Sequence, residues 1–145
     1  MLVQLALATL MVLLTVTIHG AGLMALSRVM RLEATDERRA AHGRPGLRLA
    51  TRAFAATMAI VLALFTLHGI EIWLYALVYL MTGAMAGLEH AVYFSTITYA
   101  TIGYDDQGLG EAWKLVAAIE GVNGVILLGW STAFFVTMVG RLRPA

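Results

Sequence analysis

The chain has 145 residues, of which 60% are hydrophobic and 13% are charged, and its formal net charge is +1. Soluble chains average roughly 25% charged and 45–50% apolar residues, so this composition indicates a protein that lies in lipid. It argues against a soluble enzyme and against a nucleic-acid-binding protein. The chain has no cysteine, which excludes a disulfide framework and a thiolate metal site. The length predicts a single domain.

Three apolar segments are long enough to cross a bilayer. The first, residues 2–26, contains no Asp, Glu, Lys or Arg. As a helix rising about 1.5 Å per residue, it exceeds the roughly 30 Å hydrocarbon core. A cleaved signal peptide is the alternative, but only Met1 precedes the apolar run and no basic residue does. The second segment is residues 53–80 and the third is residues 112–140. We therefore predict three transmembrane helices.

The basic residues indicate how these helices are oriented. Seven of the ten Lys and Arg residues lie in the linker 27–52, and two more follow the third segment. The positive-inside rule therefore places this linker and the C-terminus in the cytoplasm. The N-terminus and the connection 81–111 then lie outside the cell.

The connection 81–111 is too apolar for an ordinary external loop. Residues 91–100 form a run of small, β-branched and aromatic residues, which as a helix would be only about 15 Å long. Such a segment cannot cross the membrane. It can re-enter from outside, because irregular backbone is tolerated at membrane depth where protein or a water-filled cavity covers it. We predict a re-entrant helix at 89–100 and a loop at 101–106.

The sequence of this loop carries a resemblance to a known family. Thr101-Ile102-Gly103-Tyr104, after Ser95 to Ala100, resembles the pore helix and selectivity filter of the tetrameric potassium channels. The resemblance covers roughly residues 53–140 and points to the small bacterial members, with residues 2–26 as an additional helix. It implies an all-α membrane protein with three transmembrane helices, a re-entrant pore helix and a filter loop, assembled as a fourfold homotetramer.

The resemblance also implies a function, a location and a set of partners. The chain would be a passive channel for K⁺, the transported ion, with no cofactor and no enzymatic activity. It would lie in the bacterial inner membrane with the N-terminus outside and the C-terminus cytoplasmic. Its partners would be identical subunits and membrane lipids, with no nucleic acid.

A potassium filter has physical requirements that this loop can be compared with. The ion sheds its water on entering, so the pore must offer oxygens in its place. Carbonyls of consecutive residues point the same way only if φ alternates in sign, and glycine adopts positive φ at little cost. By resemblance, the carbonyls of Thr101, Ile102, Gly103 and Tyr104 bind K⁺, with the Thr101 hydroxyl at the inner end. The resemblance also assigns support of the filter to three pore-helix residues, Tyr93, Phe94 and Thr98.

Asp105 departs from the family pattern, which has a second glycine at this position of the filter. A left-handed non-glycine residue costs roughly 1–2 kcal/mol, and less for Asp. Asp106 is the acidic residue expected at the outer mouth. Four Asp105 carboxylates would form a ring there, so a non-selective monovalent cation channel is an alternative. A non-conducting membrane subunit with the same fold is a second alternative.

Ionisable residues inside the predicted helices are further candidates. Glu120 lies about two turns inside the third segment, where a charge costs roughly 3 kcal/mol. We expect it behind the pore helix, bonded there or to His68 or Glu71, which share one helix face. Whether this polar anchor affects conduction is left open. His19 is expected to make helix contacts, and the four histidines show no metal-ligand spacing.

Two features of the third segment concern gating. Gly124 lies near its middle and is a candidate hinge, although close helix packing explains a glycine there equally well. Helical periodicity places Thr132, Phe135 and Met138 on one side, which we interpret as the lining of an inner cavity.

Overall fold

The computed structural model of the chain describes residues 1–40, 47–103 and 108–142. The regular elements within these ranges are helices, and the helices contain no proline, which would interrupt them. In chain order they are α1 Leu2–Ala40, α2 Leu47–Met81, α3 Leu88–Tyr99, the 3-10 helix η1 Glu111–Trp113, and α4 Lys114–Leu142.

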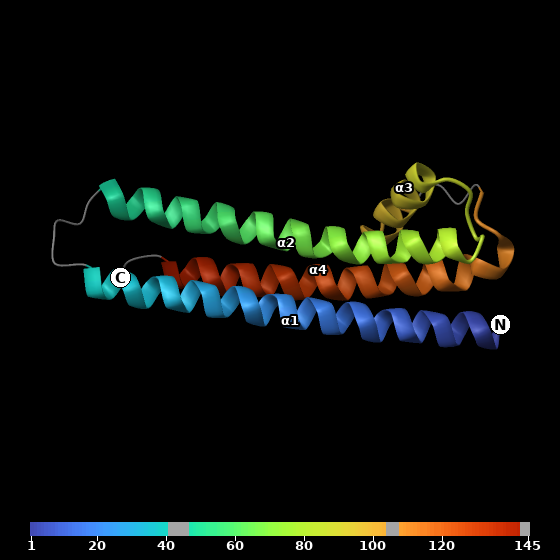
Figure 1. Ribbon diagram of the computed structural model, residues 1–145, viewed down its shortest axis with the longest axis horizontal. Coiled ribbons are helices and arrows are strands. Elements are labelled where there is room, and N and C mark those ends of the chain that lie inside the picture. The colour runs from blue at the N-terminus through green and yellow to red at the C-terminus, as the bar shows by residue number, and fades with distance from the viewer. Residues whose placement is uncertain (41–46, 104–107, 143–145) are drawn as a thin grey trace.

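The three long helices lie side by side, and α3 packs at one end of them (Figure 1). In the described part of the chain, three helical stretches are long and apolar enough to span a membrane: Leu2–Leu32, Thr51–Met81 and Glu111–Arg141. The predicted all-α membrane architecture is therefore confirmed. The helix α1 continues well past residue 26, the end of the first predicted span.

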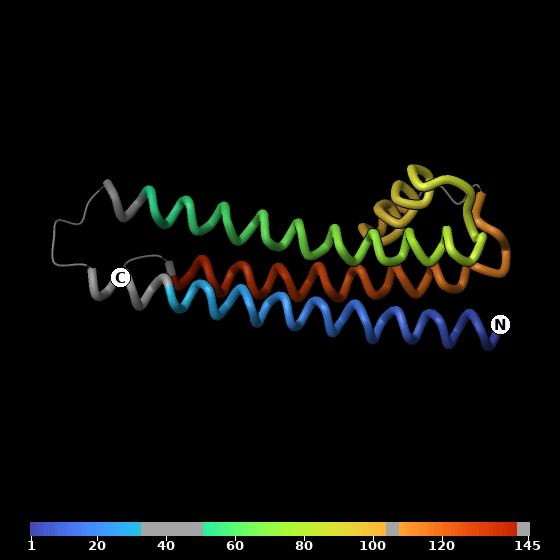
Figure 2. Tube along the Cα trace, in the orientation of Figure 1, coloured from blue at the N-terminus to red at the C-terminus, as the bar shows by residue number. Residues whose placement is uncertain are grey.

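The short helix α3 runs obliquely back along the bundle from the end of α2 (Figure 2). The turn that reverses the chain contains Gly83 with φ 69° and Gly87 with φ 88°, a backbone conformation that glycine adopts without strain. Two backbone amides, of Ala84 and Met85, connect this turn to the end of α2: they donate to the Tyr79 carbonyl at 2.9 and 3.2 Å. As a result, α3 packs against both α2 and α4.

Two clusters of buried apolar side chains hold the helices together. The α3-end cluster includes Tyr75 and Tyr79 of α2, Phe94 of α3 and Val116 of α4. The far-end cluster lies nearer the other end of the bundle and is formed by Leu23 of α1 with Ile60 and Leu64 of α2. Partly buried side chains that include Met30, Phe134, Phe135 and Met138 pack against it.

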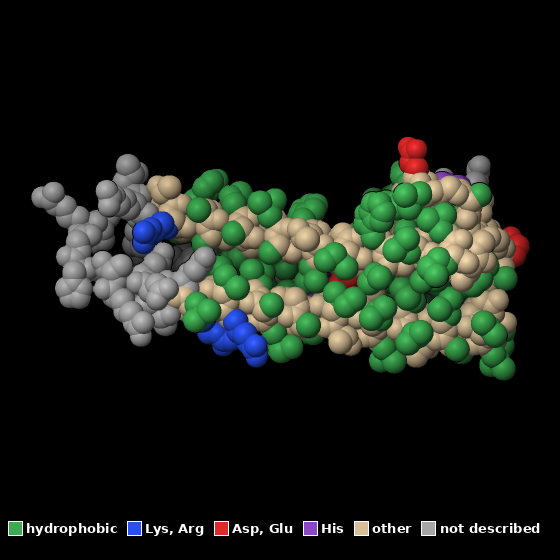
Figure 3. Space-filling model, in the orientation of Figure 1, with side chains coloured by type: hydrophobic (Ala, Val, Ile, Leu, Met, Phe, Trp, Pro, Cys, Tyr) green, Lys and Arg blue, Asp and Glu red, His purple; other side chains and the backbone are tan. Residues whose placement is uncertain are grey.

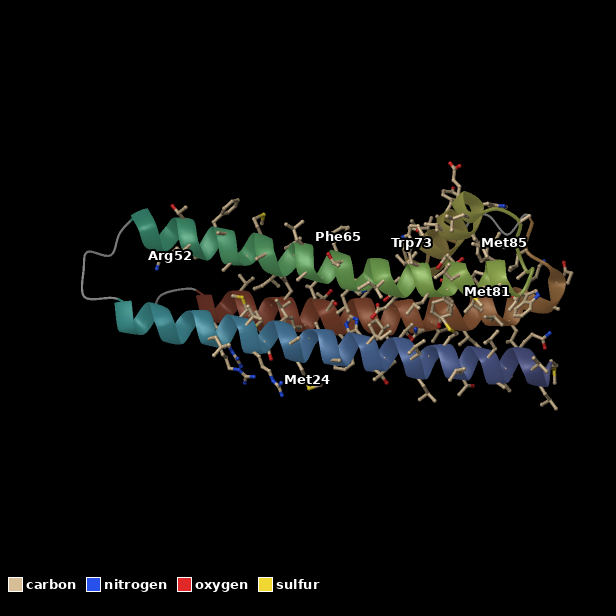
Figure 4. The ribbon with its side chains drawn as sticks, viewed as in Figure 1. Met24, Arg52, Phe65, Trp73, Met81 and Met85 are labelled. Atoms are coloured by element: carbon tan, nitrogen blue, oxygen red, sulfur yellow. The ribbon has the colours of Figure 1, made fainter. Side chains whose placement is uncertain are left out.

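The outer surface of the bundle is largely apolar (Figure 3). Figure 4 shows Met24 of α1 and Phe65 of α2 projecting away from the bundle on opposite sides, with exposed fractions of 60% and 75%. On the face seen in Figure 3, the visible basic side chains lie toward the end away from α3, and exposed acidic side chains lie at the α3 end. An apolar band between charged ends is the pattern of a membrane-spanning bundle.

Candidate functional site

The segment after α3 is tied to the last turn of that helix. The amide of Ala100 donates to the Thr96 carbonyl at 3.0 Å, and the amide of Thr101 donates to the Thr98 carbonyl at 3.0 Å. The next two amides, of Ile102 and Gly103, share the Ile97 carbonyl at 2.8 and 3.1 Å. The start of the predicted filter therefore takes its position from the C-terminal turn of α3.

The backbone of this segment alternates in handedness. Thr101 has φ 60° and Gly103 has φ 56°, whereas Ile102 between them is not in the positive-φ region. For a threonine this conformation costs roughly 1–2 kcal/mol, because the Cβ crowds the following carbonyl. Strain of this kind persists where the surrounding structure enforces it, and it is concentrated at functional sites.

The predicted filter extends past the residues that the structure describes. Tyr104, Asp105 and Asp106 lie outside the described ranges. Thr101, Ile102 and Gly103 are exposed in the single chain, and Ile102 exposes 57% of its surface. An apolar residue in such a position is available to pack against another copy of the chain or against lipid.

The end of α3 touches the backbone of α4. A Cβ atom built on Gly124 would overlap the Tyr99 carbonyl oxygen and lie 2.9 Å from the carbonyl carbon. One turn earlier, a Cβ on Gly121 would lie 3.4 Å from the Thr98 carbonyl oxygen. The helix α4 continues unbroken through both positions. Close packing thus gives a physical reason for Gly124, and a hinge at this residue stays a prediction.

Glu120 of α4 is completely buried behind α3. One carboxyl oxygen accepts from the Tyr79 hydroxyl of α2 at 2.5 Å, and the other lies 2.5 Å from the Ser95 hydroxyl oxygen of α3. The Ser95 oxygen also lies 2.9 Å from the Ile72 carbonyl oxygen. A hydroxyl carries a single hydrogen, so both contacts of the Ser95 oxygen are satisfied when Glu120 itself supplies a hydrogen. Glu120 of α4 is therefore in contact with both α2 and α3.

Glu71 of α2 forms a second buried polar cluster, which we call the Glu71 cluster: Glu71, His19, His68 and Tyr99. One carboxylate oxygen lies 2.9 Å from His19 Nδ1, and the other accepts from the Tyr99 hydroxyl at 2.5 Å. His68 Nδ1 lies 2.9 Å from the Tyr99 oxygen and 3.3 Å from Glu71. The structure thus brings His68 and Glu71 together, as their spacing suggested, but it places Glu120 in a separate set of bonds.

The Glu71 cluster could in principle hold a metal ion. One ligand atom each from His19, His68 and Glu71 lies within 4.8 Å of the others, and imidazole with carboxylate is a donor set that suits zinc. However, each of the three already has a hydrogen-bond partner in the cluster, and His19 also contacts the Ser131 hydroxyl at 3.3 Å. Hydrogen bonding alone accounts for the burial of these groups.

The hydrogen bonds of His19 and Tyr99 to Glu71 were not predicted from the sequence. His19 was expected to contact another helix, and the structure shows that its partner is the buried Glu71. Because 52 residues separate the two, no local spacing could reveal the pair. A further missed bond, one turn earlier on α1, joins that helix to α4: the Asn123 amide donates to the Thr15 hydroxyl at 2.8 Å.

The residues predicted to support the filter occupy three environments. Tyr93 is 42% exposed, Thr98 is half-buried, and Phe94 is buried with its ring edge-on to Tyr79, at a centroid distance of 5.5 Å. A cavity of about 410 Å³ lies between α3 and α4, and its lining includes Thr98, Thr101, Gly103, Gly121 and Val125. The predicted filter therefore begins at the wall of this cavity.

One prediction about α4 is wrong. Phe135 and Met138 were interpreted as lining an inner cavity, but both pack against the far-end cluster. The side of α4 that carries these two residues packs against α1 and α2, where Leu23, Ile60 and Leu64 are buried. Thr132, the third residue of that set, is exposed.

The comparisons with known proteins agree with this geometry. The family model described as "Ion channel" matches residues 60–141, which is more than half of the chain and includes most of α2 and all of α3 and η1. Comparison with curated proteins and with solved structures found no match. Channels conduct ions without catalysing a reaction, so the prediction that the chain is no enzyme is confirmed. The chain belongs to the ion channel family.

Proposed function

We propose that four copies of the chain form a membrane channel that conducts K⁺ through a central pore, with residues 101–105 as its selectivity filter. The observation that carries this proposal is the backbone after α3, where φ alternates in sign over Thr101, Ile102 and Gly103. Alternation of this kind is what a strand needs to aim consecutive carbonyls toward one ion. The Asp106 side chain would lie at the outer mouth.

The need for several copies follows from the geometry of a single chain. One loop cannot close a ring of oxygens around an ion, and closed rings of identical subunits are the usual solution in homo-oligomers. The chain also presents apolar surface next to its filter segment. Val122, Val125 and Ile126 of α4 are 63%, 53% and 59% exposed. We assign this face to the contact between neighbouring subunits.

The orientation proposed is one in which α3 and the N-terminus face outward. They lie at the same end of the bundle, and the described C-terminal end of α4 lies at the other (Figure 1). Basic Arg28, Arg31, Arg52 and Arg141 belong to helical segments near that other end. The positive-inside rule assigns the basic end to the cytoplasm, here of a bacterial inner membrane.

The test is a bi-ionic reversal potential. The purified protein is placed in a planar bilayer with KCl on one side and NaCl on the other. A shift strongly toward the potassium equilibrium potential is expected for a carbonyl-lined filter. A reversal near zero would contradict potassium selectivity and favour non-selective cation conduction, and no current from an assembled oligomer would favour the non-conducting subunit.

Two variants sharpen this test. Gly103→Val places a β-branched residue at φ 56° and is expected to abolish the current. Its assembly is checked by size-exclusion chromatography, so that loss of current is not loss of the protein. Asp105→Gly restores the usual filter residue and is expected to raise the permeability ratio of K⁺ over Na⁺. An unchanged ratio would show that Asp105 does not set the selectivity.

A further inference from the structure

The first helix lies outside the part of the chain that the ion channel family model matches. That match begins at residue 60, whereas α1 spans Leu2–Ala40. Nevertheless, α1 packs against both α2 and α4. Two of its polar side chains, Thr15 and His19, are completely buried in those contacts. A helix that served only to anchor the chain in lipid would have no need of such residues.

His19 connects α1 to the residue at the end of the pore helix. Its Nδ1 atom lies 2.9 Å from one oxygen of Glu71, and the other oxygen of Glu71 accepts the hydroxyl of Tyr99 at 2.5 Å. Tyr99 is the last residue of α3, and Thr101 with its strained φ follows two residues later. The path from α1 to the filter segment therefore runs through one carboxylate.

The donors and acceptors along this path fit one arrangement. With Glu71 as the acceptor, His19 Nδ1–H, Tyr99 O–H and His68 Nδ1–H supply the hydrogens. Ser131 can then donate to His19 Nε2, 3.3 Å away. Glu71 and His19 expose no surface, so no water replaces a lost partner. Removing His19 would leave one carboxylate oxygen without its donor.

We propose that His19 is a positioning residue of the pore. It holds Glu71 in the orientation that fixes Tyr99, and in this way α1 contributes to the position of the filter. The bond from His19 to one carboxylate oxygen and the bond from Tyr99 to the other together define the orientation of the Glu71 side chain. The Tyr99 backbone is already fixed against Gly124. Without His19, Glu71 keeps only His68 and Tyr99, both at one of its oxygens, so the carboxylate can turn and the phenol bonded to it loses its fixed position. This inference rests on the proposed channel function for its conduction readout.

The test compares three variants of the full chain. His19→Phe keeps a buried ring and removes the hydrogen bond to Glu71. His19→Asn keeps a donor close to the position of Nδ1 and is the conservative variant. Thr15→Val is the matched control, because it breaks a different buried bond between α1 and α4, to Asn123, one turn away on the same helix.

Two readouts are measured on each variant. The first is hydrogen exchange of the backbone amides of residues 100–103, whose bonds end on α3; this readout needs no ion conduction. For His19→Phe it is expected to rise about tenfold, the scale of one buried hydrogen bond left without its partner. The second is the permeability ratio of K⁺ over Na⁺, which is expected to fall. Both are expected to recover in His19→Asn and to stay unchanged in Thr15→Val.

Several results would overturn the proposal. Equal exchange in His19→Phe and in the native protein would show that α1 does not position the filter segment. Equal effects of Thr15→Val and His19→Phe would reduce His19 to general packing. If a chelator added to the native protein reproduced the His19→Phe pattern, the Glu71 cluster would hold a metal ion instead. If the native protein carried no current, the channel function would fail, whereas the exchange comparison would still decide the role of His19.

Discussion

The two ends of the bundle are stabilised in different ways. At the α3 end, buried carboxylates, hydroxyls and an amide join the helices, and α3 touches α4 with no side chain between their backbones. The far-end cluster consists of Leu, Ile, Met and Phe side chains from α1, α2 and α4. Both ends are packed, and the buried hydrogen bonds between helices described above belong to the first.

This difference shows where the molecule requires precision. Hydrogen bonds depend on distance and angle, so a helix held by Glu71 and Glu120 cannot shift without losing them. Apolar contacts are non-directional, and Met in particular adapts its shape to its neighbours. The α3 end therefore fixes α3, and with it residues 100–103, in one position. The far end can accommodate change in side-chain shape.

The largest effect on stability is expected from a substitution that separates α3 from α4. Gly124→Ala places a methyl group on the Tyr99 carbonyl, and backbone cannot yield as a flexible side chain can. We expect a loss of about 3 kcal/mol in the free energy of unfolding, measured in detergent micelles. Gly129→Ala on the same helix meets no atom within 4 Å and should be neutral or stabilising by up to about 1 kcal/mol. Equal effects of the two would contradict the close contact.

The second prediction concerns the Glu120 anchor. Glu120→Ala deprives the buried Tyr79 hydroxyl of its acceptor and should cost about 2 kcal/mol of unfolding free energy. Glu120→Gln keeps an acceptor for Tyr79 and supplies N–H to Ser95, so it should cost less than about 1 kcal/mol. The same chemical-denaturation measurement compares both variants. A glutamine variant as unstable as the alanine variant would show that a charged carboxylate is needed there.

The third prediction addresses the far-end cluster. Leu64→Met nearly conserves volume in a cluster that already contains Met30 and Met138, so the loss should be under about 1.5 kcal/mol. It is also expected to leave the hydrogen exchange of residues 100–103 unchanged. If exchange rose there, the two ends would be coupled more tightly than the comparison implies.

The smallest effect is expected at the exposed pair between α4 and η1. Lys114 Nζ lies 3.0 Å from Glu111, and their side chains are 45% and 86% exposed. Glu111→Gln should therefore change the free energy of unfolding by no more than about 0.5 kcal/mol. A loss above about 1 kcal/mol in a thermal melt would mean that this surface pair stabilises the α3 end.

Much of the fold could be predicted from the sequence. The three long apolar helices follow from charge-free runs that only a membrane tolerates, and the helix predicted at 89–100 compares with α3 at Leu88–Tyr99. The i,i+3 spacing of His68 and Glu71 also indicated their shared face, because this spacing is local. Local patterns suffice where the hydrophobic effect or helical geometry decides the outcome.

The rest depends on contacts between distant residues. The bond of His19 to Glu71 and that of Ser95 to Glu120 need the relative rotation of helices, which periodicity does not give in a helix apolar on nearly all sides. For the same reason, Phe135 and Met138 were assigned to a cavity that they do not line. Gly124 is an example, because the sequence cannot distinguish a glycine that lets its helix bend from one that lets two helices pack closely.

Tyr99 is held at both ends, its phenol by α2 and its carbonyl by α4, and this makes it a natural spectroscopic reporter. A fluorine label on the tyrosine rings, assigned at this position by comparison with a Tyr99→Phe sample, would give a resonance sensitive to the Glu71 carboxylate. Any sliding of α2 against α4 would shift that resonance. The residue that joins α3 to both α2 and α4 could thus be used to detect movement between these helices.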